Sequence, residues 1–209
     1  VDSTGKQLVV DGDWFTYDNH NQRTYVSTNY FANGQLIPNS FLQFLSGSKQ
    51  QINLYTLKAG LEFPFKTFTL VAGGKLSFIQ IDNDVSHFQL LNNSYQPDPT
   101  QTNQFNYTEN TQALYTSVSK KIKKWDFQAG LRNEFTQTKG TSVVNNQTNR
   151  TTYLQLFPTL FVTYTKDDKN IFSINYGKRI NRPYYDRLNP FRWYLSPYAY
   201  VEGNPFLKP

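Results

Sequence analysis

The sequence predicts an all-β fold: an antiparallel, up-and-down sheet of about eight strands that forms a portion of a larger transmembrane β-barrel. Three observations support this prediction. Apolar and polar residues alternate along several segments, as in strands with two different faces. The chain contains 15 Tyr, 17 Phe and 3 Trp, and aromatic residues suit pleated surfaces. Short turns alternate with long polar loops, as in outer-membrane barrels with short periplasmic turns and long extracellular loops.

The first two strands are expected at about 8–17 and 23–32. Residues 18–22 between them are Asp, Asn, His, Asn and Gln, which are residue types that favour turns. A third and a fourth strand form the clearest hairpin, at about 55–63 and 68–78, because their apolar residues occupy every second position.

Four more strands with weaker alternation complete the predicted sheet. They are expected at about 105–119, 125–135, 154–164 and 170–180. Pro158 lies inside the third of these strands, and a proline there predicts a bulge or a locally broken hydrogen-bond ladder.

The connections between these strands differ in length. Short turns are expected near 18–22, 64–67, 119–124 and 166–170, and long loops near 33–50, 83–104, 138–151 and from 182 onward. The face opposite the apolar residues is polar, as a water-filled lumen requires, and its charged residues are Lys58, Glu62, Lys75, Asp126, Arg132 and Glu134. A soluble up-and-down β structure could show the same alternation, but the unequal loop lengths favour a membrane barrel.

Composition limits the other classes of protein. The chain has no apolar run of 18 residues, which excludes a transmembrane helix but not a barrel, where only alternate residues meet lipid. It has no Cys, which excludes disulfide-stapled domains and thiolate metal sites. The net charge is +6, but the basic residues are dispersed except near 120–124, so no nucleic-acid partner is expected.

The last forty residues begin as a strand and continue as a loop rich in aromatic residues. The strand is expected to stop at Arg182 and Pro183, because proline removes a ladder donor. The aromatic and Arg side chains of the loop are the best candidates for ligand contact, and they are Tyr184, Tyr185, Arg192, Trp193, Tyr194, Tyr198 and Tyr200. The alternative is that they form an interfacial aromatic girdle or pack the loop.

Several motifs follow in order along the second half of the chain. They lie at 105–109, 125–136, 156–160, 176–183, 188–191 and 203–209. In this order they resemble the barrel of TonB-dependent outer-membrane receptors, and the Bacteroidota outer-membrane β-barrel group most closely. Residues 1–104 match that group only in their pattern of strands and loops.

The resemblance implies a location in the cell outer membrane, with outer-membrane lipid around the barrel. Such receptors carry a plug domain ahead of a barrel of about 22 strands and import scarce nutrients with energy passed on by the TonB complex. Residues 1–209 would then be the middle part of the barrel, with the plug domain, the segment that contacts TonB and the C-terminal strands outside this chain. A surface lipoprotein partner is also implied, and the ligand could be a small molecule, a glycan or a peptide.

The motif residues are expected to set loop geometry rather than to touch a ligand. They are Arg182, Pro183, Leu188, Asn189, Pro190, Gly203, Asn204 and Pro205. No catalytic residue or cofactor is expected, because His20 and His87 lie in predicted turn or loop positions and no Gly-rich phosphate loop or serine-nucleophile elbow is present. No metal site is expected either, because Asp82, Asp84 and His87 lack the spacing and glycine of a calcium loop. The main alternative function is a cell-surface β-rich module that binds glycan or protein; an all-β hydrolase is a weaker one, since no carboxylate pair stands out.

Overall fold

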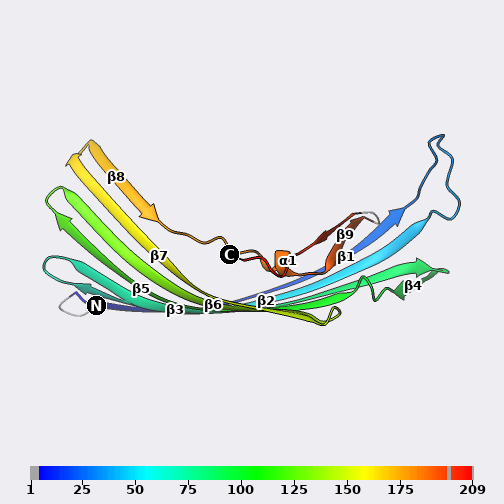
Figure 1. Cartoon of the computed structure of the whole chain (residues 1–209), viewed down its shortest axis with the longest axis horizontal. Helices are drawn as coiled ribbons and strands as arrows, with labels where there is room; N and C mark the ends of the chain where they lie inside the picture. The colour runs from blue at the N-terminus through cyan, green and yellow to red at the C-terminus, as the bar shows by residue number, and fades with distance from the viewer. Residues whose placement is uncertain (1–4, 197–198, 209) are drawn as a thin grey trace.

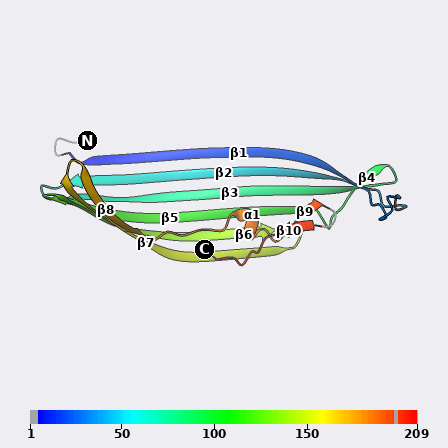
Figure 2. The ribbon, with the colours of Figure 1, turned by 90° about the horizontal axis from the view of Figure 1, so that it is seen from above.

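One long antiparallel sheet dominates the computed structural model, which describes residues 5–196 and 199–208. The main strands are β1 (Gln7–Ser27), β2 (Leu42–Pro64), β3 (Thr69–Leu91), β5 (Asn103–Ile122), β6 (Trp125–Ser142), β7 (Gln147–Asp167) and β8 (Asn170–Gly177). They lie side by side in chain order, and short β4 (Ser94–Pro97) pairs with β3 (Figure 1, Figure 2). The predicted all-β, up-and-down architecture is confirmed, with β1 and β8 at the open edges of the sheet.

The residues that follow β8, 178–196 and 199–208, are called the terminal segment. It contains helix α1 (Tyr185–Leu188) and the small hairpin of β9 (Arg192–Ser196) and β10 (Ala199–Glu202). Within the described residues, no helix is long and apolar enough to cross a membrane.

The turn predicted at residues 18–22 is wrong. These residues lie inside β1, which pairs with β2 without a register shift from Gln7 to Ser27. Their backbone groups are satisfied by the ladder to β2, and that pairing overrides the turn preference of Asp and Asn. The first two predicted strands are therefore one, and β4 brings the number of strands in the described sheet to eight.

The predicted long loops are largely strand as well. The connection between β1 and β2 is residues 28–41, β3 continues to Leu91, and only residues 143–146 separate β6 from β7. The opposite ends of the strands carry the tight turns 65–68, 123–124 and 168–169. In the sequence these polar strand ends resemble loops, because their convex-face side chains are not apolar and the alternation is lost.

The convex face of the sheet carries an apolar band. Partner residues of neighbouring strands share a face, and the pairing places on this face Leu8, Val10, Trp14, Tyr55, Leu57, Leu61, Leu76, Phe78, Leu114, Val118, Trp125, Phe127, Leu131, Leu154, Leu156, Leu160, Phe172, Ile174 and Tyr176, all of them exposed. On β6 the band runs from Trp125 to Phe135 and on β7 from Leu154 to Tyr164. These lengths fit the roughly 9–11 residues that a tilted strand needs to cross a bilayer.

The band occupies only the half of the sheet near the tight turns. Beyond it, the same face presents Asn110, Gln137 and Thr152, which lie in one row across β5, β6 and β7. The strands therefore continue past the apolar band on the side of the longer connections, by 13 residues on β3 (Phe78 to Leu91) and by 7 on β6 (Phe135 to Ser142). In outer-membrane barrels the short turns are periplasmic, and polar strand ends opposite them lie on the extracellular side.

The terminal segment lies on the concave face of the sheet (Figure 1). The sequence places it as an extracellular loop that follows an outward strand, but it instead turns back over β5, β6 and β7 (Figure 2). The residues it covers form the buried part of the molecule, including Ile81, Phe105 and Tyr107.

Pro158 explains where β8 ends. The ladder between β6 and β7 passes Pro158 without a shift, so no bulge is present there. On the other side, Lys178 donates its N–H to the Pro158 carbonyl at 3.2 Å, and proline has no N–H to return. The β7–β8 ladder therefore stops at the preceding pair, Thr159 and Gly177, which releases the terminal segment from the sheet.

One tyrosine on the concave face requires two glycines beside it. Gly60, Gly73 and Tyr115 are partners on β2, β3 and β5, and the Tyr115 hydroxyl would lie 2.9 Å from a Cβ atom at Gly60. A Cβ atom at Gly73 would overlap both the Tyr115 ring and the Ala59 carbonyl oxygen. The Tyr115 ring thus packs directly against the backbone of Gly60 and Gly73, which carry no side chain.

Substitution at Gly73 tests this packing. Gly73→Ala is expected to destabilise the sheet by about 1–3 kcal/mol, the usual cost of overpacking. The measurement is the denaturation midpoint of the full-length protein in detergent micelles. Gly12→Ala is the matched control, because a Cβ atom there meets nothing within 4 Å. Equal midpoints for the two variants would contradict the packing described.

Charge placed on the convex face tests the position of the membrane. Leu131 lies near the middle of the band on β6, and Gln137 lies on the same strand and face above it. Leu131→Arg is expected to destabilise the folded barrel by about 2–4 kcal/mol, whereas Gln137→Arg stays within about 1 kcal/mol. Equilibrium folding of the full-length protein into lipid vesicles measures both, and a larger effect at Gln137 would refute the assigned band.

Candidate functional site: the concave face beneath the terminal segment

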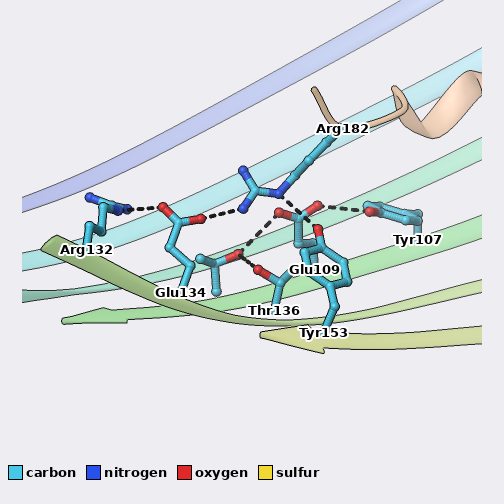
Figure 3. Close-up of polar contacts among 8 residues, drawn as sticks. Tyr107, Glu109, Arg132, Glu134, Thr136, Tyr153 and Arg182 are labelled. Atoms are coloured by element: carbon cyan, nitrogen blue, oxygen red, sulfur yellow. Dashed lines mark hydrogen bonds and ion pairs between the residues drawn. The ribbon is translucent and has the colours of Figure 1, made fainter. Parts of the chain in front are cut away.

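Arg182 anchors the terminal segment to the sheet (Figure 3). Its Nη2 donates to Glu134 Oε2 on β6, and its Nε donates to the Tyr153 hydroxyl on β7 at 2.9 Å. The guanidinium also lies 6.0 Å from the centre of the Tyr153 ring, close enough for a cation–π contact. One side chain therefore joins the segment to two strands.

Glu134 accepts from two arginines at once. Arg132 Nε donates to Glu134 Oε1 at 2.5 Å, while Arg182 occupies the other carboxylate oxygen. The Glu134 side chain is only 9% exposed, so the two cations offset the cost of burying its charge. Burial acts to lower the pKa of Arg182, but the hydrogen bonds to Glu134 and Tyr153 outweigh it and raise that pKa. The anchor therefore stays charged.

A second polar cluster lies beside the first, around Glu109 on β5 (Figure 3). Glu109 accepts from the Tyr107 hydroxyl at 2.9 Å and from the Thr111 hydroxyl at 3.3 Å. Thr111 also contacts the hydroxyl of buried Thr136 at 3.2 Å. Both carboxylates are thus held in place by neighbours on the sheet.

An apolar patch supports the next part of the segment. Tyr185 and Leu188 of α1 pack against Ile81, Phe105 and Tyr107. Burial raises the pKa of the Tyr185 hydroxyl, and the charges of Asp186 and Tyr17 act in the same direction. Tyr185 therefore remains a neutral, mainly packing side chain.

The end of the segment is tied back to α1 by backbone hydrogen bonds. Gly203 N–H donates to the Asn189 carbonyl at 3.0 Å, and Asn204 N–H donates to the Arg187 carbonyl at 2.7 Å. A side chain at Gly203 would collide with the Asn189 and Arg187 backbone. Asn189 also accepts from Phe191 N–H at 3.1 Å and lies 3.5 Å from the Asn103 amide on β5.

A small cavity separates the segment from the sheet. Glu109, Tyr153, Arg182, Leu188, Pro205 and Leu207 are among the residues that line it. Its volume is about 40 Å³, which is room for about one water molecule and far below the roughly 300–1,000 Å³ of small-molecule pockets. In this arrangement the concave face beneath the segment is closed to ligands of the size that small-molecule pockets hold.

The predicted ligand-contact residues whose side chains are described differ in their surroundings. Tyr184 is 74% exposed and Tyr185 faces the sheet. Arg192 pairs with Glu202 at 3.1 Å and lies 4.6 Å from the Tyr200 ring centre.

Three more predicted ligand-contact residues are incompletely described. Only the backbone of Trp193 and Tyr194 is described, in β9, and Tyr198 lies outside the described residues.

The predicted motif residues lie at or near the cavity. Arg182, Pro183, Leu188 and Pro205 line it, while Asn189, Gly203 and Asn204 make the backbone contacts above, and Pro190 is partly buried next to them. The sequence does not single out Tyr153, the partner of Arg182, and it includes Glu109 only as the last residue of the motif at 105–109. It does place Arg132 and Glu134 on the polar face, and this placement is the sequence feature that points to the anchor site.

The residues considered as cation ligands do not converge. Strand alternation puts Asp82 and Asp84 on the convex face and His87 on the concave one. Among the described residues, no group of three or more His, Cys, Asp or Glu side chains could hold a metal ion.

Removing the anchor tests its contribution to the site. Arg182→Gln is expected to lower the local opening free energy of the terminal segment by about 1–3 kcal/mol, because Glu134 loses a charged hydrogen bond. Amide hydrogen exchange over residues 183–207 of the full-length protein measures the change. Arg179→Gln is the control, since Arg179 is exposed on the same segment. Unchanged protection in Arg182→Gln would show that the apolar contacts alone hold the segment.

Comparison with known proteins finds similar barrels. The ferric citrate transporter FecA in the unliganded form is 13% identical, with a TM-score of 0.46 over 78% of this chain and 25% of that chain. The ferric yersiniabactin uptake receptor FyuA from Yersinia pestis is 16% identical, with a TM-score of 0.41 over 78% of this chain and 26% of that chain. The chain thus spans about a quarter of these two structures.

No curated protein matches the sequence. Residues 1–209 match the family described as the outer membrane protein beta-barrel family. Together with the exposed apolar band, this match puts the protein in the outer membrane. The chain belongs to the outer membrane protein beta-barrel family.

Proposed function

We propose that this chain is part of the barrel of a TonB-dependent receptor that takes up a scarce nutrient across the outer membrane, without chemical change to the nutrient. The observation that carries the proposal is the division between the two faces of the sheet. The convex face offers lipid an apolar band, and the concave face offers charged and hydroxyl side chains. Such a wall suits a path for a polar solute through lipid.

The open edges of the sheet support a larger barrel. Lipid does not tolerate the unpaired backbone groups that β1 and β8 present at the two edges. We propose that residues 1–209 form a middle part of the barrel, closed by strands outside this chain. The plug domain and the segment that contacts the TonB complex lie outside it as well, and a surface lipoprotein could deliver the ligand from above.

The terminal segment has two roles in this proposal. Arg182, Pro183, Leu188, Asn189, Pro190, Gly203, Asn204 and Pro205 hold its shape against the concave wall. The exposed side chains above them, Tyr184 and the Arg192–Tyr200 pair, contact the ligand from the lumen, together with Trp193, Tyr194 and Tyr198, while Tyr185 packs the segment against the sheet. Aromatic faces and an Arg fork suit this role.

Uptake by cells tests the proposal. Deletion of the full-length gene is expected to abolish energised accumulation of one labelled nutrient from a panel of iron chelates, cobalamin, glycans and peptides. A Tyr184→Ala/Tyr200→Ala double variant is expected to reduce accumulation at least about tenfold, since hot-spot truncations cost about 2 kcal/mol or more. Tyr30→Ala, an exposed tyrosine of the 28–41 connection, serves as the control.

Two results would argue against uptake. Accumulation that persists after the membrane is de-energised would remove the TonB-dependent step. Labelled glycan or protein that stays on the cell surface without entering would instead favour a surface binding module.

A further inference from the structure

Two basic side chains lie directly opposite each other on the convex face. Lys139 on β6 and Arg150 on β7 are partners in the antiparallel ladder, and both are exposed. Like charges placed directly across a strand pair destabilise a sheet. An anion bound between the two side chains would offset this repulsion.

The side chains directly adjacent to the pair carry no negative charge. On the same face, Thr108 is the β5 partner of Lys139, and Gln137 and Thr141 flank it along β6. Thr148 and Thr152 flank Arg150 along β7. Within the described part of the chain, neither Lys139 nor Arg150 takes part in an ion pair.

The height of the pair matches lipid headgroups. Lys139 lies four residues above Phe135, and Arg150 lies four residues above Leu154, the last apolar residues of the band on each strand. Four residues of a tilted strand rise about 10 Å. The headgroup layer begins at the edge of the hydrocarbon, and long basic side chains can reach down toward it.

An apolar hollow lies below the pair on the same face. Ala59 and Gly74 form its floor, because they carry the smallest side chains in their row, and Leu57, Leu76, Leu114 and Phe135 are among the residues around it. Its volume is about 430 Å³. Phe135 and Leu154 line the hollow and stand directly beneath Lys139 and Arg150.

We propose that this part of the convex face binds one outer-leaflet lipid with a phosphate headgroup. The planar guanidinium of Arg150 donates hydrogen bonds to two phosphate oxygens. Lys139 supplies a second positive charge, and neighbouring threonine hydroxyls donate further hydrogen bonds. An acyl chain of the same lipid fills the hollow. The two like charges destabilise the sheet when no lipid is bound, and they select lipids that carry an anionic headgroup.

Lipid titration of the full-length protein in neutral detergent tests the proposal. The probes are dioctanoyl phosphatidic acid, phosphatidylcholine with the same chains, and inorganic phosphate, each followed by native mass spectrometry. The anionic lipid is expected to bind best. Lys139→Gln and Arg150→Gln are each expected to weaken it about fivefold, and the double variant more than about tenfold.

Matched variants separate the headgroup from the chain. Lys66→Gln/Lys123→Gln removes two charges from the tight turns at the opposite end of the sheet and is expected to leave binding unchanged. Gly74→Leu fills the hollow, where a Cβ atom meets only ordinary contacts of 3.4 Å, and is expected to weaken the lipid but not inorganic phosphate. Wild-type binding in the Lys139→Gln/Arg150→Gln variant, or inorganic phosphate that competes as well as the lipid, would overturn the proposal.

Discussion

The structure depends on the requirement that backbone N–H and C=O groups in lipid find partners within the protein. The sheet meets it with ladders that run without a shift from β1 to β7, each 17 or more residue pairs long. A fixed register of this length also sorts the side chains, because a slip by one residue would exchange the faces. The lipid-facing band and the polar lumen wall are two consequences of one hydrogen-bond pattern.

The sequence predicts best where this sorting is visible in the side chains. Residues 55–63 and 68–78 alternate cleanly because one of their faces meets lipid, and their strands were identified correctly. Residues 18–22 belong to the same kind of strand, but both of their faces meet water. Periodicity then carries no signal, and residue type alone predicts a turn. The errors therefore concentrate above the apolar band.

The candidate site was predicted less completely, for a different reason. Arg182 and Glu134 are 48 positions apart in the chain, and no local pattern relates them. Their contact follows from Pro158, which stops β8 and releases the chain over the concave face. The sequence indicates that the ladder is disturbed at Pro158, but not that the released segment turns inward. An anchor made of a buried carboxylate between two arginines then favours one placement of the segment over others.

The strands extend beyond the apolar band that lies in the membrane, so part of the sheet stands in water on the side of the longer connections. On β3, thirteen residues follow Phe78 before the strand ends at Leu91, which corresponds to a rise of roughly 30 Å for a tilted strand. On this side of the sheet the wall thus stands above the lipid surface by about the thickness of the bilayer core, and at β6 and β7, which extend seven residues past the band, by about half as much. The rim of the wall therefore lies away from the membrane, and in the proposed receptor a large solute would reach it without first crossing the layer of lipid headgroups.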